Sequence, residues 1–221
     1  MYKVRLSFFK KDYAKFVSHL DLMKMFQRVF RIAGVDVTFS QGFNPHPKMS
    51  IAYPLPVGVT SGEEYLDLQV DSAPDYVDLV NKINSAMPKD IKITKAWEPR
   101  DNMNEICLAE YTTILTLYNE ISELESVIET FMARKDIVVD KKTKKGISAT
   151  DIKSMIKKVD VVENNGREVT IKMLLSIGEK ANLKATTVLE AMEKYIEGFA
   201  VEYTDINRDG IFKENMTKID I

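Results

Sequence analysis

The feature that most constrains this fold is an order of secondary-structure signals that occurs twice along the 221-residue chain. Strict period-two alternation is typical of half-buried strands, and apolar residues three and four apart are typical of amphipathic helices. In the first half, these rules predict strands at 3–8, 35–39, 49–55, 65–70 and 91–94, with helices at 18–33 and 73–87. We summarise this order as βαββαβ, with 35–39 as an additional short strand.

The same order follows a polar, proline-punctuated stretch at 99–106, which we interpret as a linker. The elements expected there are strands at 111–118 and 137–139, helices at 121–133 and 186–196, a hairpin of 159–163 with 168–175, and a last strand at 199–204. An Asn-Asn-Gly turn at 164–166 favours the hairpin. A basic loop at 141–146 and a capped helix at 148–158 are expected as an insertion.

Two βαββαβ units predict an α+β protein made of two tandem ferredoxin-like folds, each an antiparallel sheet with both helices on one face. The expected domains are 1–98, carrying an unusual loop, and 107–221, carrying the basic insertion. In such a sheet the other face stays open unless a partner covers it. On the central strands, the residues expected to face outward are Lys3, Arg5, Ser7, Tyr65, Asp67 and Gln69. They could stack and clamp single-stranded RNA, or Arg5 and Asp67 could simply pair across strands.

The first helix has two distinct faces. Ser18 and Asp21 form a start signal that resembles a capping box, and Gly34 ends the helix. Its expected apolar stripe consists of Met23, Phe26, Phe30 and Ala33. Lys24, Arg28 and Arg31, spaced by four and three, share the opposite face.

The segment 39–48 is the most unusual in the chain because prolines flank one of its only two histidines, His46. Ordinary helices and central strands do not tolerate this arrangement. We therefore expect an ordered loop that presents an aromatic ring, an amide, an imidazole and an ammonium group. The residues concerned are Phe43, Asn44, His46 and Lys48.

Charge is segregated along the chain although the net charge is only −2. Residues 1–50 carry nine Lys/Arg against three Asp, residues 51–110 carry five against eleven Asp/Glu, and residues 134–158 carry nine against three. This pattern indicates local basic surfaces. Within the second basic block, Lys141, Lys142, Lys144 and Lys145 resemble a phosphate-gripping finger. Such contacts would position a nucleic-acid backbone without specifying sequence; the plain alternative is a solvated loop.

Several chemistries find no support in the sequence. The single cysteine, Cys107, can form neither an internal disulfide nor a cysteine-ligated cluster. Phosphate-binding and dinucleotide-binding glycine motifs are missing, and two isolated histidines make a zinc site unlikely to form. We expect a cytoplasmic protein with no cofactor, no metal, no membrane association and no DNA partner. Metal-free acid–base chemistry stays open, because His19 and His46 could cleave RNA through its 2′-hydroxyl.

The segments 16–23, 39–47, 54–58 and 61–67 carry a family resemblance. With Phe-Val-Ser-His-Leu-Asp-Leu-Met, Phe-Ser-Gln-Gly-Phe-Asn-Pro-His-Pro, Pro-Leu-Pro-Val-Gly and Ser-Gly-Glu-Glu-Tyr-Leu-Asp, they resemble the bacterial radical-SAM-linked proteins, a domain of unknown function. That resemblance implies a separate radical-SAM partner and an RNA or ribosomal target. More distantly, tandem ferredoxin-like units with a histidine in the first helix are similar to CRISPR repeat-processing endoribonucleases.

The leading hypothesis is a non-catalytic RNA-binding module that presents RNA or a ribosomal element to a radical-SAM enzyme. Its expected contacts are His19, Arg28, Arg31, the four loop residues named above and the four lysines of the finger. A metal-independent endoribonuclease using His19 and His46 is the first alternative. A protein-interaction scaffold is the second.

Overall fold

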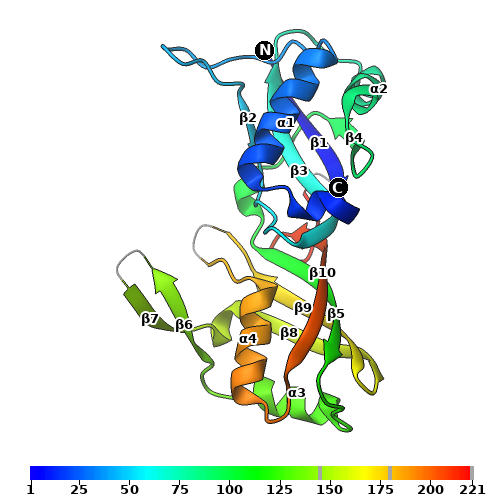
Figure 1. Cartoon of the computed structure of the whole chain (residues 1–221). Helices are drawn as coiled ribbons and strands as arrows, with labels where there is room; N and C mark the ends of the chain where they lie inside the picture. The colour runs from blue at the N-terminus through cyan, green and yellow to red at the C-terminus, as the bar shows by residue number, and fades with distance from the viewer. Residues whose placement is uncertain (144–145, 179–180, 220–221) are drawn as a thin grey trace. The chain divides into compact units, whose positions relative to one another are not determined.

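The computed structural model describes residues 1–143, 146–178 and 181–219 (Figure 1). It divides into two compact units, Met1–Ile106 with Gly210–Ile221, and Cys107–Asp209. No helix in the described part is long and apolar enough to cross a membrane.

The first unit has the predicted βαββαβ order, without the additional strand expected at 35–39. Its elements are β1 (Tyr2–Lys10), a 3-10 helix (Asp12–Phe16), α1 (His19–Ile32), β2 (Met49–Ile51), β3 (Val59–Val70), α2 (Tyr76–Ala86) and β4 (Ile91–Trp97). The strands lie in the order β4-β1-β3-β2, and the three pairings are antiparallel. The first and third strands are therefore central, as expected for a ferredoxin-like sheet.

The core of this unit lies between the sheet and its two helices. Val4, Leu6 and Phe8 of β1 are fully buried and belong to one cluster with Phe26 of α1 and Ile83 of α2. Because Val4, Leu6 and Phe8 alternate along the strand, they share one face of the sheet. Both helices therefore pack on that face, and Figure 1 shows α1 in front of β1 and β3.

The ends of α1 confirm the start and stop signals. The Ser18 side chain accepts a hydrogen bond from the backbone N–H of Asp21, which satisfies one of the free amides of the first turn. Gly34, just beyond the last turn, has a φ of 65°, a left-handed conformation that glycine adopts without steric cost.

The strand predicted at 35–39 does not form. Only two isolated bridges occur there, Val37 with Val70 and Phe39 with Pro47. β2 is also shorter than the predicted 49–55 and ends at Ile51. Pro54 and Pro56 lack the amide hydrogen that would extend its ladder. The chain between these short pairings leaves the sheet as the loop at 39–48, which projects from the unit in Figure 1.

The expected linker and the residues from Gly210 onward belong to the first compact unit, so the bounds of the units differ from the predicted 1–98, 99–106 and 107–221. A 3-10 turn at Met103–Glu105 is closed by a capping box on Asn102. Lys213 forms ion pairs with Asp101 and Glu105, and Lys218 pairs with Glu63. Ion pairs of this kind produce no period-two or period-3.6 pattern in the sequence, so the hydrophobic periodicity could not predict them.

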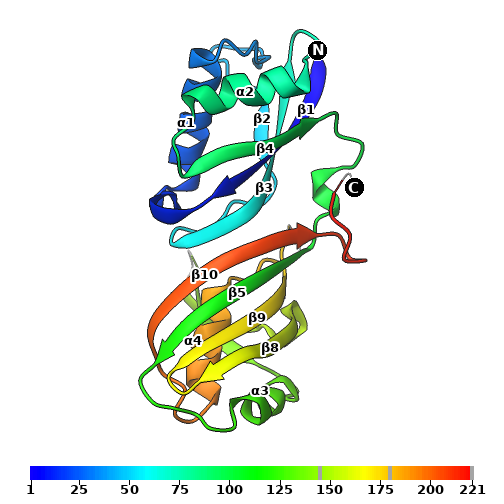
Figure 2. The ribbon, with the colours of Figure 1, turned by 90° about the vertical axis from the view of Figure 1, so that its right-hand side faces the viewer.

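The second unit repeats the topology. Its elements are β5 (Leu108–Leu117), α3 (Leu124–Met132), β6 (Val138–Thr143), β7 (Gly146–Asp151), a 3-10 turn (Lys153–Met155), β8 (Ile156–Asn165), β9 (Glu168–Ser176), α4 (Ala185–Tyr195) and β10 (Val201–Phe212). The strand order β10-β5-β9-β8 is again ferredoxin-like (Figure 2). The α+β class is confirmed, as is the predicted β8–β9 hairpin, and Leu124, Ile128 and Phe131 of α3 are buried.

The prediction that the insertion consists of a basic loop and a capped helix was wrong. The insertion is a β6–β7 hairpin, and the expected helix at 148–158 is replaced by the end of β7, a 3-10 turn and the start of β8. Asp151 closes the base of this hairpin by accepting hydrogen bonds from the N–H groups of Ile137 and Lys153, and these bonds lower the pKa of its carboxyl. The side chain that seemed to cap a helix therefore terminates a hairpin instead.

Truncating Phe26 tests the contact between α1 and the sheet. Its ring meets Phe8 edge to face, with centroids 5.2 Å apart. We expect Phe26→Ala to lower the free energy of unfolding by about 3–5 kcal/mol, because it leaves a cavity in a packed core. Ile32→Ala, on the exposed side of the same helix, should change it by less than about 0.5 kcal/mol. Urea denaturation followed by circular dichroism measures both; equal effects would contradict this packing.

Candidate functional site

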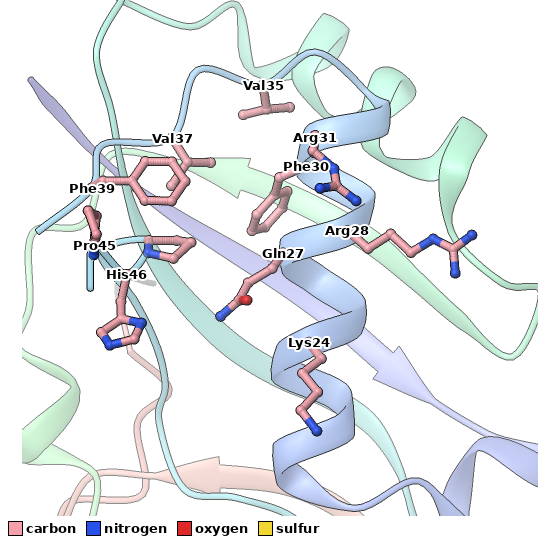
Figure 3. Close-up of a pocket in the computed structure, with 11 residues that line it drawn as sticks. Lys24, Gln27, Arg28, Phe30, Arg31, Val35, Val37, Phe39, Pro45 and His46 are labelled. Atoms are coloured by element: carbon pink, nitrogen blue, oxygen red, sulfur yellow. The ribbon is translucent and has the colours of Figure 1, made fainter. Parts of the chain in front are cut away.

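A cleft of about 400 Å³ lies in the first unit, between α1 and the loop that follows it (Figure 3). We call it the α1–loop cleft. It is lined by Lys24, Gln27, Arg28, Phe30, Arg31, Val35, Val37, Phe39, Pro45, His46 and Pro47. One wall is therefore the polar face of a helix, and the other is an aromatic and proline-rich loop.

The helix wall is basic because the apolar face of α1 packs in the core, so the opposite, basic face points outward. Phe26 is buried under the sheet, so Lys24, Arg28 and Arg31 point outward and are exposed. Among the described residues, the guanidinium groups of Arg28 and Arg31 make no hydrogen bond or ion pair. Lys24 approaches Asp21 at 3.7 Å, with both side chains exposed; a pair of this kind contributes little. The helix wall thus carries positive charge that is not neutralised by the other described residues.

The side chains of this wall differ in direction. Figure 3 shows Gln27 directed toward the loop, whereas Arg28 extends to the far side of the helix and Arg31 lies near the upper end of the cleft. The arginines consequently form a rim. The carboxamide of Gln27 is the polar group that faces the interior.

The loop wall is fixed by hydrogen bonds at its base. The N–H of Ser40 donates to the carbonyl of His46 at 2.8 Å, and the N–H of His46 donates to Ser40 Oγ at 3.0 Å. The N–H of Lys48 donates to the Thr38 carbonyl at 2.8 Å, next to the bridge between Phe39 and Pro47. Beyond this base, Gly42 has a φ of 126°, which an L side chain rarely adopts. The loop is therefore anchored at both ends and turns at a glycine.

Two aromatic rings on this loop are left uncovered by the fold. Phe39 lines the cleft and is 50% exposed, and Phe43 near the tip is fully exposed. The floor beneath them is apolar, since Phe30 and Val37 are buried. The result is a small cleft with an apolar floor, aromatic and proline surfaces on one side and a cationic rim on the other.

The structure brings together three of the predicted RNA-binding residues, Arg28, Arg31 and His46, which all line the cleft. Phe43 and Asn44 are exposed on the same loop but do not line it. Lys48 lines a separate depression of about 320 Å³ that also includes Lys3. The cleft is also lined by five residues that were not among the predicted RNA contacts, although helical spacing had placed the first of them on the face of Arg28 and Arg31: Lys24, Gln27, Phe39, Pro45 and Pro47.

The cleft does not bring the two histidines together. His19 is the first residue of α1 and lies outside the lining, which contains His46 as its single histidine. His19 Nδ1 is buried and has no hydrogen-bond partner among the described residues. No aspartate or glutamate lines the cleft within the described part. The two histidines proposed from the sequence for RNA cleavage therefore do not both line this cleft.

The predicted lysine finger falls in the second unit and only part of it can be placed. Lys141 and Lys142 belong to β6, paired across the hairpin with Ser148 and Ile147. Lys144 and Lys145 lie outside the described residues. No cluster of metal-ligating side chains is found in the described part of either unit.

The outward face of the first sheet is not an open RNA platform. Arg5 and Tyr65 are each only 1% exposed, and Ser7 is buried. Arg5 forms a two-point ion pair with Asp67, at 2.7 Å and 2.8 Å, and donates to the Asp101 carbonyl at 3.1 Å. Burial, reinforced by the charge of Glu63, raises the pKa of Tyr65. The cross-strand pairing that the sequence left as an alternative is the one that forms.

Comparison with known proteins places the chain in a family. A family described as "Uncharacterized protein conserved in bacteria (DUF2344)" matches residues 3–185. The chain belongs to this family. The DUF2344 description agrees with the bacterial, functionally unassigned group that the sequence resembles, and it mentions no radical-SAM enzyme, so that link stays a prediction. Among curated proteins, none matches this chain.

Three solved structures superpose on the chain at low identity. A chain of a Cbf5-Nop10-Gar1 complex superposes with a TM-score of 0.54 at 12% identity, over 96% of this chain and 50% of that one. An archaeal box H/ACA sRNP Nop10-Cbf5 complex gives 0.49 at 11% identity, over 96% and 49%. An H/ACA RNP bound to a substrate RNA gives 0.46 at 11%, over 86% and 44%. This DUF2344 chain spans about half the length of these solved chains. The first likeness supports the fold alone.

Removing Asp67 tests whether the outward sheet face is structural. Asp67→Ala leaves the buried Arg5 guanidinium without its carboxylate, so we expect the free energy of unfolding to fall by about 3–5 kcal/mol. Gln69→Ala, two residues along the same strand and face, should cost less than about 1 kcal/mol. Thermal or urea unfolding compares them; an Asp67→Ala protein as stable as Gln69→Ala would contradict the role given to this ion pair.

Proposed function

We propose that this protein is an RNA-binding accessory module that binds through the α1–loop cleft and does not itself catalyse a reaction. The observation that carries the proposal is the pair of guanidinium groups of Arg28 and Arg31, which have no partner among the described residues and form the rim of a small cleft whose loop wall exposes aromatic surface. Basic groups that contact a phosphate backbone and aromatic rings that stack on bases are the usual components of a nucleic-acid site. RNA is favoured because its loops and ends offer bases that can leave the stack.

The same residues argue for binding without chemistry. Cleavage through the 2′-hydroxyl requires a base and an acid near one phosphate. His46 is the cleft's single imidazole, and no carboxylate accompanies it among the described lining residues. These groups can hold RNA, and a separate enzyme would act on it. We propose a radical-SAM enzyme for that role, on the strength of the sequence resemblance. Lys141, Lys142, Lys144 and Lys145 would add backbone contacts from the second unit.

One of the similar solved structures is described as an H/ACA RNP bound to a substrate RNA. At 11% identity and a TM-score of 0.46 it adds nothing to the proposal. The proposal depends on the charge and exposure of the cleft in this chain.

The direct test is the salt dependence of RNA binding by the full chain. Labelled transfer and ribosomal RNA would be titrated with protein in EDTA between 50 and 300 mM salt, with native and denaturing gels run together. We expect binding that weakens steeply with salt and no cleavage products. Arg28→Ala/Arg31→Ala should weaken binding and reduce the slope of log K against log salt by about 1 to 2, since each lost phosphate contact removes about one released counterion.

A charge-matched control uses two other exposed cations of the same unit, Lys89 and Lys95. Lys89→Ala/Lys95→Ala removes the same net charge but leaves the cleft intact, so it should keep both affinity and slope near those of the parent. Binding that ignores salt, or equal losses in the two double variants, would overturn the cleft as the RNA site. Cleavage abolished by His46→Ala would instead establish catalysis.

A further inference from the structure

The loop wall of the cleft exposes aromatic and proline rings, and these rings indicate which form of RNA the cleft can bind. Phe39 is 50% exposed beside Pro45 and Pro47, and Phe43 is fully exposed near the loop tip. Packing does not account for the exposed ring surface, because half of Phe39 and all of Phe43 stay in solvent. Flat apolar surface of this kind is complementary to the face of another planar ring.

In a duplex the faces of the bases are covered by their neighbours in the stack. An A-form helix presents 2′-hydroxyls, phosphates and the edges of bases to a protein. The faces become available only where nucleotides are unpaired and splayed out. A cleft of about 400 Å³ with an apolar floor of Phe30 and Val37 also suits one inserted ring better than the broad groove of a helix.

The polar groups are arranged around this surface in a way that fits one nucleotide. Gln27 is directed toward the loop in Figure 3, and its carboxamide has no hydrogen-bond partner among the described residues. A carboxamide both donates and accepts, which matches the edge of a base. Arg28 and Arg31, on the rim, would reach the phosphates on either side of an inserted base.

We infer that the α1–loop cleft selects unpaired RNA, with one base inserted against Phe39 and a neighbouring base stacked on Phe43. The inference rests on the proposed RNA-binding function and specifies its substrate class. Phosphate contacts alone would accept single strands and duplexes alike. The aromatic loop therefore supplies the discrimination between them.

The experiment compares one RNA in two forms. A fluorescein-labelled ten-nucleotide RNA and the same strand annealed to its complement would be titrated with the full chain, and fluorescence anisotropy would give both affinities. We expect the single strand to bind at least about tenfold more tightly. Phe43→Ala and Phe39→Ala should each weaken single-strand binding by about 5- to 150-fold while leaving duplex binding unchanged.

The controls separate this inference from the proposed function. Phe43 is fully exposed, so its truncation should not affect folding, and Tyr13→Ala removes another exposed aromatic ring of the same unit, away from the cleft lining. Tyr13→Ala should bind like the parent. Equal affinity for both RNA forms with unaffected Phe43→Ala, but losses in Arg28→Ala/Arg31→Ala, would overturn the inference and leave RNA binding standing. No binding of either form would overturn both.

Discussion

The packing of α1 against β1 is the interaction on which the rest of the first unit depends. Phe26 meets Phe8 edge to face at 5.2 Å, within a core that also includes Leu22, Val29 and Phe30. Burying this stripe fixes the rotation of the helix about its axis. Because side chains three and four apart share a face, the same rotation turns Lys24, Arg28 and Arg31 outward. The cationic wall of the cleft is thus a consequence of the core.

On the other face of the sheet, and around it, charged side chains are neutralised by ion pairs within the first unit. Arg5 is buried against Asp67, and the C-terminal residues add pairs from Lys213 and Lys218 to acidic partners in the same unit. Charges held in this way are not available to a ligand without a large desolvation and pairing penalty. The α1–loop cleft differs because its arginines are unpartnered among the described residues, and this contrast is why we assign RNA binding to the cleft and stability to the sheet face.

The sequence predicted the fold well where periodicity and capping signals were strong. The two βαββαβ orders, the Ser18 cap, the Gly34 stop and the Asn-Asn-Gly hairpin all appear in the structure. It failed where one signal fits two structures: Ser148 and Asp151 match a helix cap, yet Asp151 closes a hairpin. At the site, helical spacing indicated Lys24, Arg28 and Arg31. Helical spacing could not predict that Phe39 and Gln27 line the same cleft, because their proximity depends on how the loop returns to the sheet.

The central claim is that RNA contacts the first unit at the α1–loop cleft. Photo-crosslinking of the full chain to RNA containing 4-thiouridine, followed by mapping of the crosslinked peptides, tests it most directly. The account predicts that crosslinks concentrate within 24–31 and 39–47 and decline as salt is raised. Crosslinks confined to the second unit, or spread evenly over both units at every salt concentration, would contradict it.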